Sequence, residues 1–114
     1  MEDCIFCKIV KGEIPSKKVY ENEYVLAFED ITPKAKVHVL VIPKIHIKDL
    51  NEVNESNTVY ITNIMSSIKE IAEILNIDTS GYRVISNVGE DGMQEVPHLH
   101  FHVLGGEKLN FVKV

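Results

Sequence analysis

Residues 98–104 read His-Leu-His-Phe-His-Val-Leu and follow directly after Pro97. Successive side chains of a β-strand point to opposite faces of a sheet, so a strand here has one polar face and one apolar face. The polar face carries His98, His100 and His102, and the apolar face carries Leu99, Phe101 and Val103. Neighbouring histidines on such a face are about 6.6–7 Å apart along the strand, so their rings can converge on one small anion or metal ion. The apolar face is suited to packing on a helix.

Four further segments favour strands because they are rich in β-branched and aromatic residues: 19–20, 24–28, 37–42 and 82–87. Residues 37–42 (VHVLVI) are almost wholly apolar, which predicts a central strand that ends at Pro43. The connections between strands are short and favour antiparallel pairing.

Two segments predict helices. Residues 55–75 place apolar residues at three- and four-residue steps: Val59, Ile61, Ile64, Met65, Ile68, Ile71, Ala72 and Leu75. A short helix is expected over 3–11, opened by Asp3 as N-cap and ended at Gly12. We therefore expect one α+β domain over residues 1–114, an antiparallel sheet of about five strands with one long and one short helix.

Composition limits the possible partners of this 114-residue chain. Its formal charge of −5 argues against a protein that binds the nucleic-acid backbone, whereas a single nucleotide needs only a local site. No apolar run reaches the length of about 18 residues that a membrane span needs, and the N-terminus lacks the features of a signal peptide. We therefore expect a cytoplasmic protein with no nucleic-acid or membrane partner.

The three spaced histidines allow two kinds of chemistry. A neutral imidazole is a good nucleophile for phosphoryl transfer near pH 7, and a neighbouring imidazole can stabilise the phosphoryl oxygens. Alternatively, histidines two apart on a strand can hold a catalytic zinc ion that activates water. Spacing alone leaves both readings open, as well as a sheet face that carries histidines without a function.

Three segments of the chain are similar, in order and spacing, to the histidine triad (HIT) family: IFCKIVKGEIPS (5–16), LAFEDITPKAKVHVLVIPKIHI (26–47) and GYRVISNVGEDGMQEVPHLHFHVLGG (81–106). The small size and the final LGG resemble the nucleotide-binding, phosphoramidase-type branch. This resemblance implies a HIT-like homodimer that hydrolyses nucleoside 5′-phosphoramidates or related α-phosphate derivatives and needs no cofactor for catalysis.

The resemblance also implies roles for individual residues. In the family the middle histidine attacks the α-phosphorus, so His100 would form a covalent nucleotidyl-histidine, with His102 on the phosphate and His38 supporting both. The implied contacts with an AMP-like purine nucleotide are Ile14, Phe28, Asp30, Ile31, Asn87, Gln94, Glu95, His100 and His102. Without the resemblance, a turn cap before Thr32-Pro33 is the alternative interpretation of Asp30.

Two residues depart from the family pattern in the segment before the histidines. Met93 stands where the family often has glycine, and its side chain can restrict the approach of backbone to a phosphate. Glu95 stands where the family often has a hydroxyl residue. A carboxylate beside a phosphate is unfavourable unless it is protonated or points outward, but it can serve an amine leaving group.

Cys4-x-x-Cys7 is a weak motif by itself. It fits two cysteines packed under a helix, a redox pair or half of a metal site. Some bacterial-type HIT proteins resemble this chain in having such a pair together with zinc. The resemblance implies a structural zinc site of Cys4, Cys7, His46 and His98, because two thiolates and two imidazoles close a tetrahedral zinc site.

Two alternative functions remain from the sequence. One is a metal-dependent hydrolase that uses His98, His100 and His102 as ligands. The other is a purine nucleotide-binding module without catalytic activity.

Overall fold

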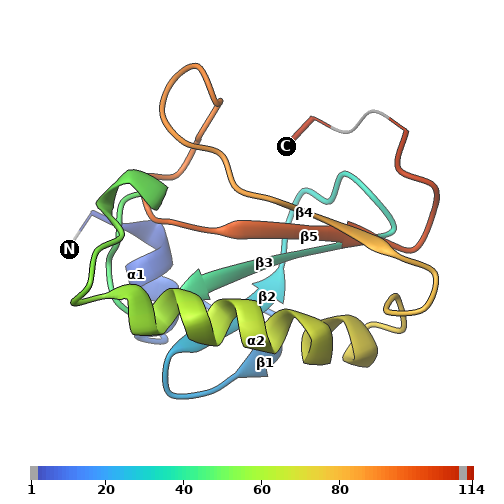
Figure 1. The fold of residues 1–114 in the computed structure, drawn as a ribbon, viewed down its shortest axis with the longest axis horizontal. Helices are drawn as coiled ribbons and strands as arrows, with labels where there is room; N and C mark the ends of the chain where they lie inside the picture. The colour runs from blue at the N-terminus through green and yellow to red at the C-terminus, as the bar shows by residue number, and fades with distance from the viewer. Residues whose placement is uncertain (1–2, 111–112) are drawn as a thin grey trace.

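The computed structural model describes residues 3–110 and 113–114. Within these residues it contains a five-stranded sheet of order β1-β2-β3-β5-β4, in which every neighbouring pair is antiparallel (Figure 1). The strands are β1 (Lys18–Glu21), β2 (Val25–Glu29), β3 (Val37–Pro43), β4 (Tyr82–Ile85) and β5 (Phe101–Gly105). The predicted α+β fold class is confirmed, and the apolar segment 37–42 is the central strand.

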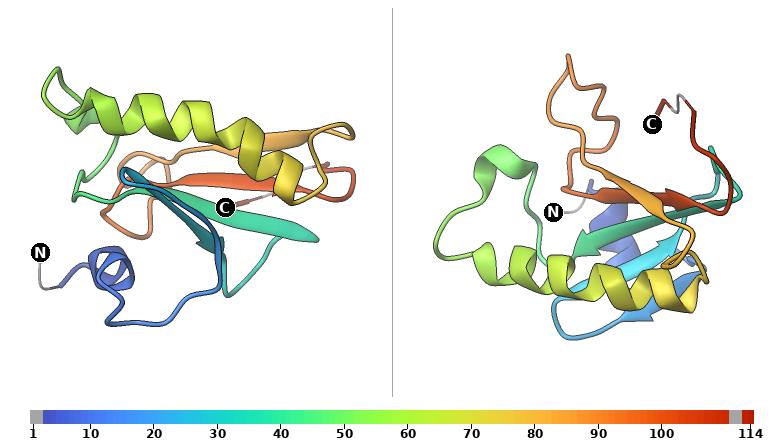
Figure 2. Two further views of the ribbon diagram at one scale, coloured as in Figure 1. Left: turned by 90° about the horizontal axis from the view of Figure 1, so that it is seen from below. Right: turned by 45° about the vertical axis from the view of Figure 1, so that its right-hand side comes forward.

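Helices lie on opposite faces of this sheet. Helix α1 (Ile5–Val10) covers one face and helix α2 (Thr58–Ile74) covers the other (Figure 2). A short 3-10 helix, η1 (Leu50–Glu52), lies between β3 and α2. Burial of apolar side chains against each helix drives this three-layer arrangement.

The alternation along β3 and β5 decides which side chains face which helix. Val39 and Val41 of β3, and Phe101 and Val103 of β5, belong to the core that includes the buried face of α2. Leu40 points the opposite way, into the core beneath α1, and pairs in register with His102. The predicted packing of the apolar face of residues 98–104 on the long helix is confirmed, and the histidines are left on the α1 side.

The segment that carries the histidines is only partly a strand. β5 begins at Phe101, so His98 and His100 precede it. The main-chain N–H of Leu99 instead donates to the carbonyl oxygen of Ile47 at 2.6 Å, in the loop after β3. The expected strand over 98–104 is therefore wrong at its start, because the chain after Pro97 is bonded to a loop before it joins the sheet.

Two helix details also differ from the expectation. Cys4, not Asp3, caps α1, because the Cys4 sulfur accepts the main-chain N–H of Cys7 at 3.3 Å. On α2, Val59 and Met65 are exposed although they fit the apolar pattern. Gly12 ends α1 as predicted, with a left-handed φ of +79° that suits glycine.

Within the described parts of the chain, neither helix has the length and apolar character needed to cross a membrane.

Candidate active site

A cleft of about 870 Å³ opens on the α1 side of the sheet. One end is apolar and is walled by α1 and by residues from β2 and the segment after α1: Ile5, Phe6, Ile9, Ile14 and Phe28. The other end is polar and is lined by imidazoles and an amide: His38, His100, His102 and Asn87. A cleft with an apolar pocket at one end and convergent polar groups at the other suits a ligand with a ring system and a charged group.

His100 is held by the main chain in one tautomer. Its Nδ1 lies 2.7 Å from the carbonyl oxygen of His98. A carbonyl oxygen can only accept, so Nδ1 carries the proton and donates it to this bond. The neutral ring then has its lone pair on Nε2, the nitrogen that remains for the cleft. The hydroxyl of Ser86 donates to the carbonyl oxygen of His100 at 2.9 Å and fixes the main chain of the same residue.

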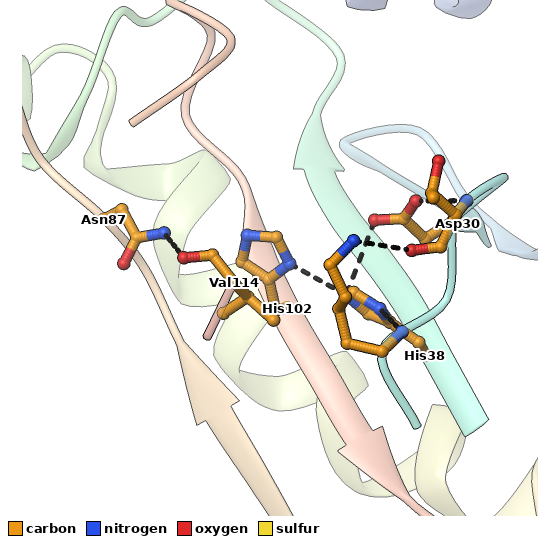
Figure 3. A network of polar contacts seen from close by, with 7 residues as sticks. Asp30, His38, Asn87, His102 and Val114 are labelled. Carbon is orange, nitrogen blue, oxygen red and sulfur yellow. Dashed lines mark hydrogen bonds and ion pairs between the residues drawn. The ribbon is translucent and has the colours of Figure 1, made fainter. Parts of the chain in front are cut away.

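A chain of hydrogen bonds also sets the tautomer of His102 (Figure 3). The main-chain N–H of Lys34 donates to Nδ1 of His38 at 3.0 Å, so a neutral His38 carries its proton on Nε2. That nitrogen lies 2.9 Å from Nδ1 of His102 and donates to it. The proton of His102 is therefore on Nε2. Its ring centroid is 5.0 Å from that of His100, so a donor N–H stands beside a nucleophilic lone pair.

Burial keeps these imidazoles neutral. It lowers the pKa of His102 to about 4, and the neighbouring His100 and His38 lower that pKa further. Burial also lowers the pKa of His100, against the opposing effects of its bond to the His98 carbonyl and of Asp30 and Glu95. The pKa of His38 is lowered by burial and partly restored by Asp30. All three rings are consequently neutral near pH 7.

Asp30 caps its own turn and also lines the cleft. Its Oδ1 accepts the main-chain N–H of Thr32 at 2.9 Å, which is the turn-capping role. Its Oδ2 lies 3.5 Å from Nε2 of His38. The side chain lines the cleft together with its neighbour Ile31, which is 98% exposed. The capped turn thus presents a carboxylate and an apolar side chain at the cleft.

Of Met93, Gln94 and Glu95, in the loop before β5, only two line the cleft. Met93 and Glu95 line the cleft. Gln94 is not among the residues that line it, because its amide donates to the carbonyl oxygens of Lys48 at 2.8 Å and Val96 at 3.0 Å. Met93 adopts a left-handed φ of +61°, which explains why glycine suits this position. Gln94 thus braces the loop, whereas a direct nucleotide contact was expected of it.

Asn87 lines the polar end of the cleft, as expected, but its amide has a protein partner. Nδ2 donates to the main-chain oxygen of Val114 at 2.8 Å (Figure 3). Lys113 and Val114 therefore line the cleft next to Asn87.

Sequence reasoning missed several residues of the cleft. Phe6 packs edge-on against Phe28, His98 and His100, with ring centroids 5.6, 5.8 and 5.2 Å away. Phe6 lies between two cysteines on an amphipathic helix, and this position could have predicted that its ring faces the histidines. Lys34 contributes its main-chain N–H, which donates to His38. The pattern of side chains in the sequence could not have predicted this bond.

The four predicted metal ligands lie close together in the structure. The ligand atoms of Cys4, Cys7, His46 and His98 all lie within 4.8 Å of one another. Nδ1 of His98 is 3.2 Å from the Cys4 sulfur and 3.5 Å from the Cys7 sulfur, and Nδ1 of His46 is 3.4 Å from the Cys7 sulfur. Sulfur and nitrogen ligands of a tetrahedral zinc ion are separated by about 3.6 Å, given the usual bond lengths. The donor set therefore fits zinc in type, number and spacing.

The surroundings of Cys7 disfavour its thiolate form when no metal is bound. Burial, and then the neighbouring Cys4, raise the pKa of the Cys7 thiol to about 11. A thiol with such a pKa is not a reactive thiolate at neutral pH.

Both ring nitrogens of His98 have partners outside the cleft, unlike those of His100 and His102. Nε2 of His98 donates to the carbonyl oxygen of Pro43 at 3.1 Å, and its Nδ1 faces the cysteines. Both ring nitrogens are engaged away from the cleft, so His98, His100 and His102 do not share one metal position. A second close group, Asp30, His38 and His102, consists of residues that already pair with one another.

Comparisons with known proteins agree with this geometry. A model of the HIT domain family matches residues 11–109. An uncharacterized HIT-like protein of Buchnera aphidicola subsp. Baizongia pistaciae is 49% identical over 106 residues, which are 93% of this chain and 95% of that protein.

Solved structures of the same family superpose closely. A HIT family hydrolase from Clostridium thermocellum has a TM-score of 0.93 and 48% identity, covering 97% of this chain and 96% of that one. A histidine triad nucleotide-binding protein from Candida albicans has a TM-score of 0.81 and 40% identity, covering 89% of this chain and 73% of that one.

Proposed function

The chain belongs to the HIT family, and from this premise we propose that it is a nucleotide hydrolase that cleaves nucleoside 5′-phosphoramidates or related α-phosphate derivatives through a nucleotidyl-histidine. The names of two similar structures, a hydrolase and a nucleotide-binding protein, support this class. The observation that carries the mechanism is the tautomer of His100, whose Nδ1–H is bonded to the His98 carbonyl and whose Nε2 is free for attack.

The first step transfers the nucleotidyl group to the enzyme. Nε2 of His100 attacks the α-phosphorus, a P–N bond forms, and the bond from phosphorus to the leaving amine breaks as the amine takes a proton from solvent water. The ring becomes cationic, and the His98 carbonyl oxygen, 2.7 Å from Nδ1, stabilises that charge. His102 donates from Nε2 to a phosphoryl oxygen. Its partner His38 keeps Nδ1 of His102 unprotonated.

The second step releases the product. Water attacks the same phosphorus, the bond to Nε2 breaks, a proton of the water passes to solvent, and a nucleoside 5′-monophosphate leaves with regeneration of neutral His100. The same donors stabilise both transition states, because the phosphoryl oxygens occupy the same position in the two steps.

The remainder of the cleft suits the nucleoside. Phe28 and Ile14, with Phe6 and Ile9 from α1, form an apolar wall that a purine base can contact. Oδ2 of Asp30 accepts from a ribose hydroxyl, while Oδ1 stays in its turn. Glu95, exposed at the polar end, suits a leaving group that carries an amine.

We further propose a structural zinc ion at Cys4, Cys7, His46 and His98. When bound, it crosslinks α1, the loop after β3 and the segment before β5. The bond from Nε2 of His98 to Pro43 directs Nδ1 toward the thiols, as second-shell partners of metal ligands do. A thiol pair that holds zinc needs a reducing compartment, which is consistent with the proposed cytoplasmic location.

A homodimer completes the proposal. β4 forms one edge of the sheet, and its Tyr82 and Val84 side chains are 38% and 39% exposed. An unpaired edge with apolar side chains suits pairing with the same strand of a second copy. Sedimentation of the protein and of a Val84→Lys variant tests this arrangement, since the variant is expected to be monomeric.

The test of the reaction uses adenosine 5′-phosphoramidate, with and without a strong chelator, and a His100→Ala variant. The proposal expects turnover at saturating substrate that survives chelation and is lost in the variant. Loss of this saturated turnover on chelation, with the protein still folded, supports the metal-dependent alternative. AMP binding without any turnover supports the binding module.

A further inference from the structure

His98 lies between two sites that the proposed function treats separately. Its ring belongs to the Cys4–Cys7–His46–His98 group, called here the cysteine–histidine cluster. Its carbonyl oxygen holds Nδ1 of His100 at 2.7 Å. The side chain is completely buried and is fixed at both nitrogens, so its main chain has little freedom while the cluster is intact.

A second connection runs through the loop after β3. His46, a cluster residue, precedes Ile47, whose carbonyl oxygen accepts the main-chain N–H of Leu99 at 2.6 Å. Leu99 is the residue between His98 and His100. The two histidines of the cluster therefore fix the main chain on which the nucleophile is carried.

A third connection runs through α1. Cys4 and Cys7 lie on either side of Phe6, whose ring is edge-on to His98 and to His100. Ile5 and Phe6 also line the apolar end of the cleft. Holding the two thiols thus holds one wall of the nucleoside pocket, although neither cysteine lines the cleft.

We propose that the cysteine–histidine cluster and the nucleotide site are energetically coupled, with His98 as the positioning residue that joins them. Zinc in the cluster restrains the main chain of His98 and the position of α1, and so tightens nucleotide binding. By thermodynamic reciprocity a bound nucleotide tightens zinc binding by the same factor. This inference rests on the proposed nucleotide and zinc sites.

The test uses His46→Ala, because His46 contributes to the cluster but does not line the cleft. Ile45→Ala is the matched control, since Ile45 lies in the same loop, is exposed and has no part in the cluster. Calorimetry measures the affinity for 5′-AMP of zinc-loaded wild type, metal-stripped wild type and both variants under reducing conditions. Circular dichroism selects the samples that are folded.

We expect His46→Ala and the stripped wild type to bind 5′-AMP about tenfold more weakly than the zinc-loaded protein and the Ile45→Ala control. Saturating 5′-AMP is expected to lower zinc transfer to a competing chelator by the same factor. If stripping unfolds the wild type, the His46→Ala comparison decides alone. Equal affinities in folded samples with and without zinc overturn the coupling.

A second readout does not depend on nucleotide. The ¹⁵N shifts of the His100 ring report its hydrogen bonding, and we expect zinc removal to shift the Nδ1 resonance because the bond to the His98 carbonyl oxygen weakens. Should no sample bind 5′-AMP, the proposed nucleotide function fails, and the His100 spectrum alone decides the coupling. A spectrum that is unchanged by zinc overturns it.

Discussion

Lowering the pH from 7 to 5 should destabilise this protein through His102. The ring is only 7% exposed, and burial lowers its pKa to about 4. In the unfolded chain a histidine has a pKa of about 6.5. The unfolded chain therefore binds more protons between these two values, and the free energy of unfolding falls as the pH falls. For one group with these pKa values, the loss between pH 7 and pH 5 is about 2 kcal/mol.

Urea denaturation at a series of pH values, for the wild type and for His102→Gln, isolates this contribution. Both proteins share the acidic groups and the other histidines, so the difference between their pH dependences belongs to His102 and its coupling to His38 and His100. We expect the variant to lose about 2 kcal/mol less than the wild type on acidification. Identical pH dependences in the two proteins would refute the neutral, buried state of His102.

Three substitutions test other parts of the account. Met93→Gly relieves about 1–2 kcal/mol of left-handed strain in the folded protein, but glycine also gives the unfolded chain more conformational entropy, which opposes folding. We expect a net rise of about 0.5 kcal/mol in the free energy of unfolding. A free energy of unfolding no higher than that of Met93→Ala contradicts this. Asp30→Asn keeps the turn to Thr32 but removes the carboxylate, so calorimetry should find about tenfold weaker 5′-AMP binding and less discrimination against 2′-deoxy-AMP. Phe6→Leu should lower stability by about 1–2 kcal/mol and weaken 5′-AMP binding, whereas Phe101→Leu, on the α2 face, should lower stability only; equal effects on binding contradict the assigned wall.

Most of the fold prediction rested on the alternation of apolar and polar side chains along the strands. It correctly placed Leu99, Phe101 and Val103 against the long helix, because side-chain direction in an extended chain is a local property. It failed at the first residues of the segment, where Leu99 bonds to Ile47 in a distant loop. Likewise, Met65 fits the helical pattern but is exposed, since the pattern does not show how wide a face the sheet covers.

Most of the residues predicted for the site from the sequence line the cleft, but the hydrogen bonds between them were not predicted. The family resemblance gave His38, His100 and His102, but their tautomers depend on main-chain groups of Lys34 and His98 that only the folded chain brings near. Gln94 shows the same limit for a residue that was expected to contact the nucleotide. Its amide is used by Lys48, 46 residues away, and no pattern around the histidine motif predicts that bond.

The most direct test of the central claim is to trap the covalent intermediate. The protein is mixed with saturating adenosine 5′-phosphoramidate in the presence of a chelator, quenched in alkali, which preserves phosphoramidate bonds, and examined by intact-mass and peptide-mapping mass spectrometry. We predict an adenylyl group on His100 that appears within one turnover and is absent from His100→Ala. Turnover by His100→Ala at the wild-type rate, or an adenylyl group on another residue, would contradict the account.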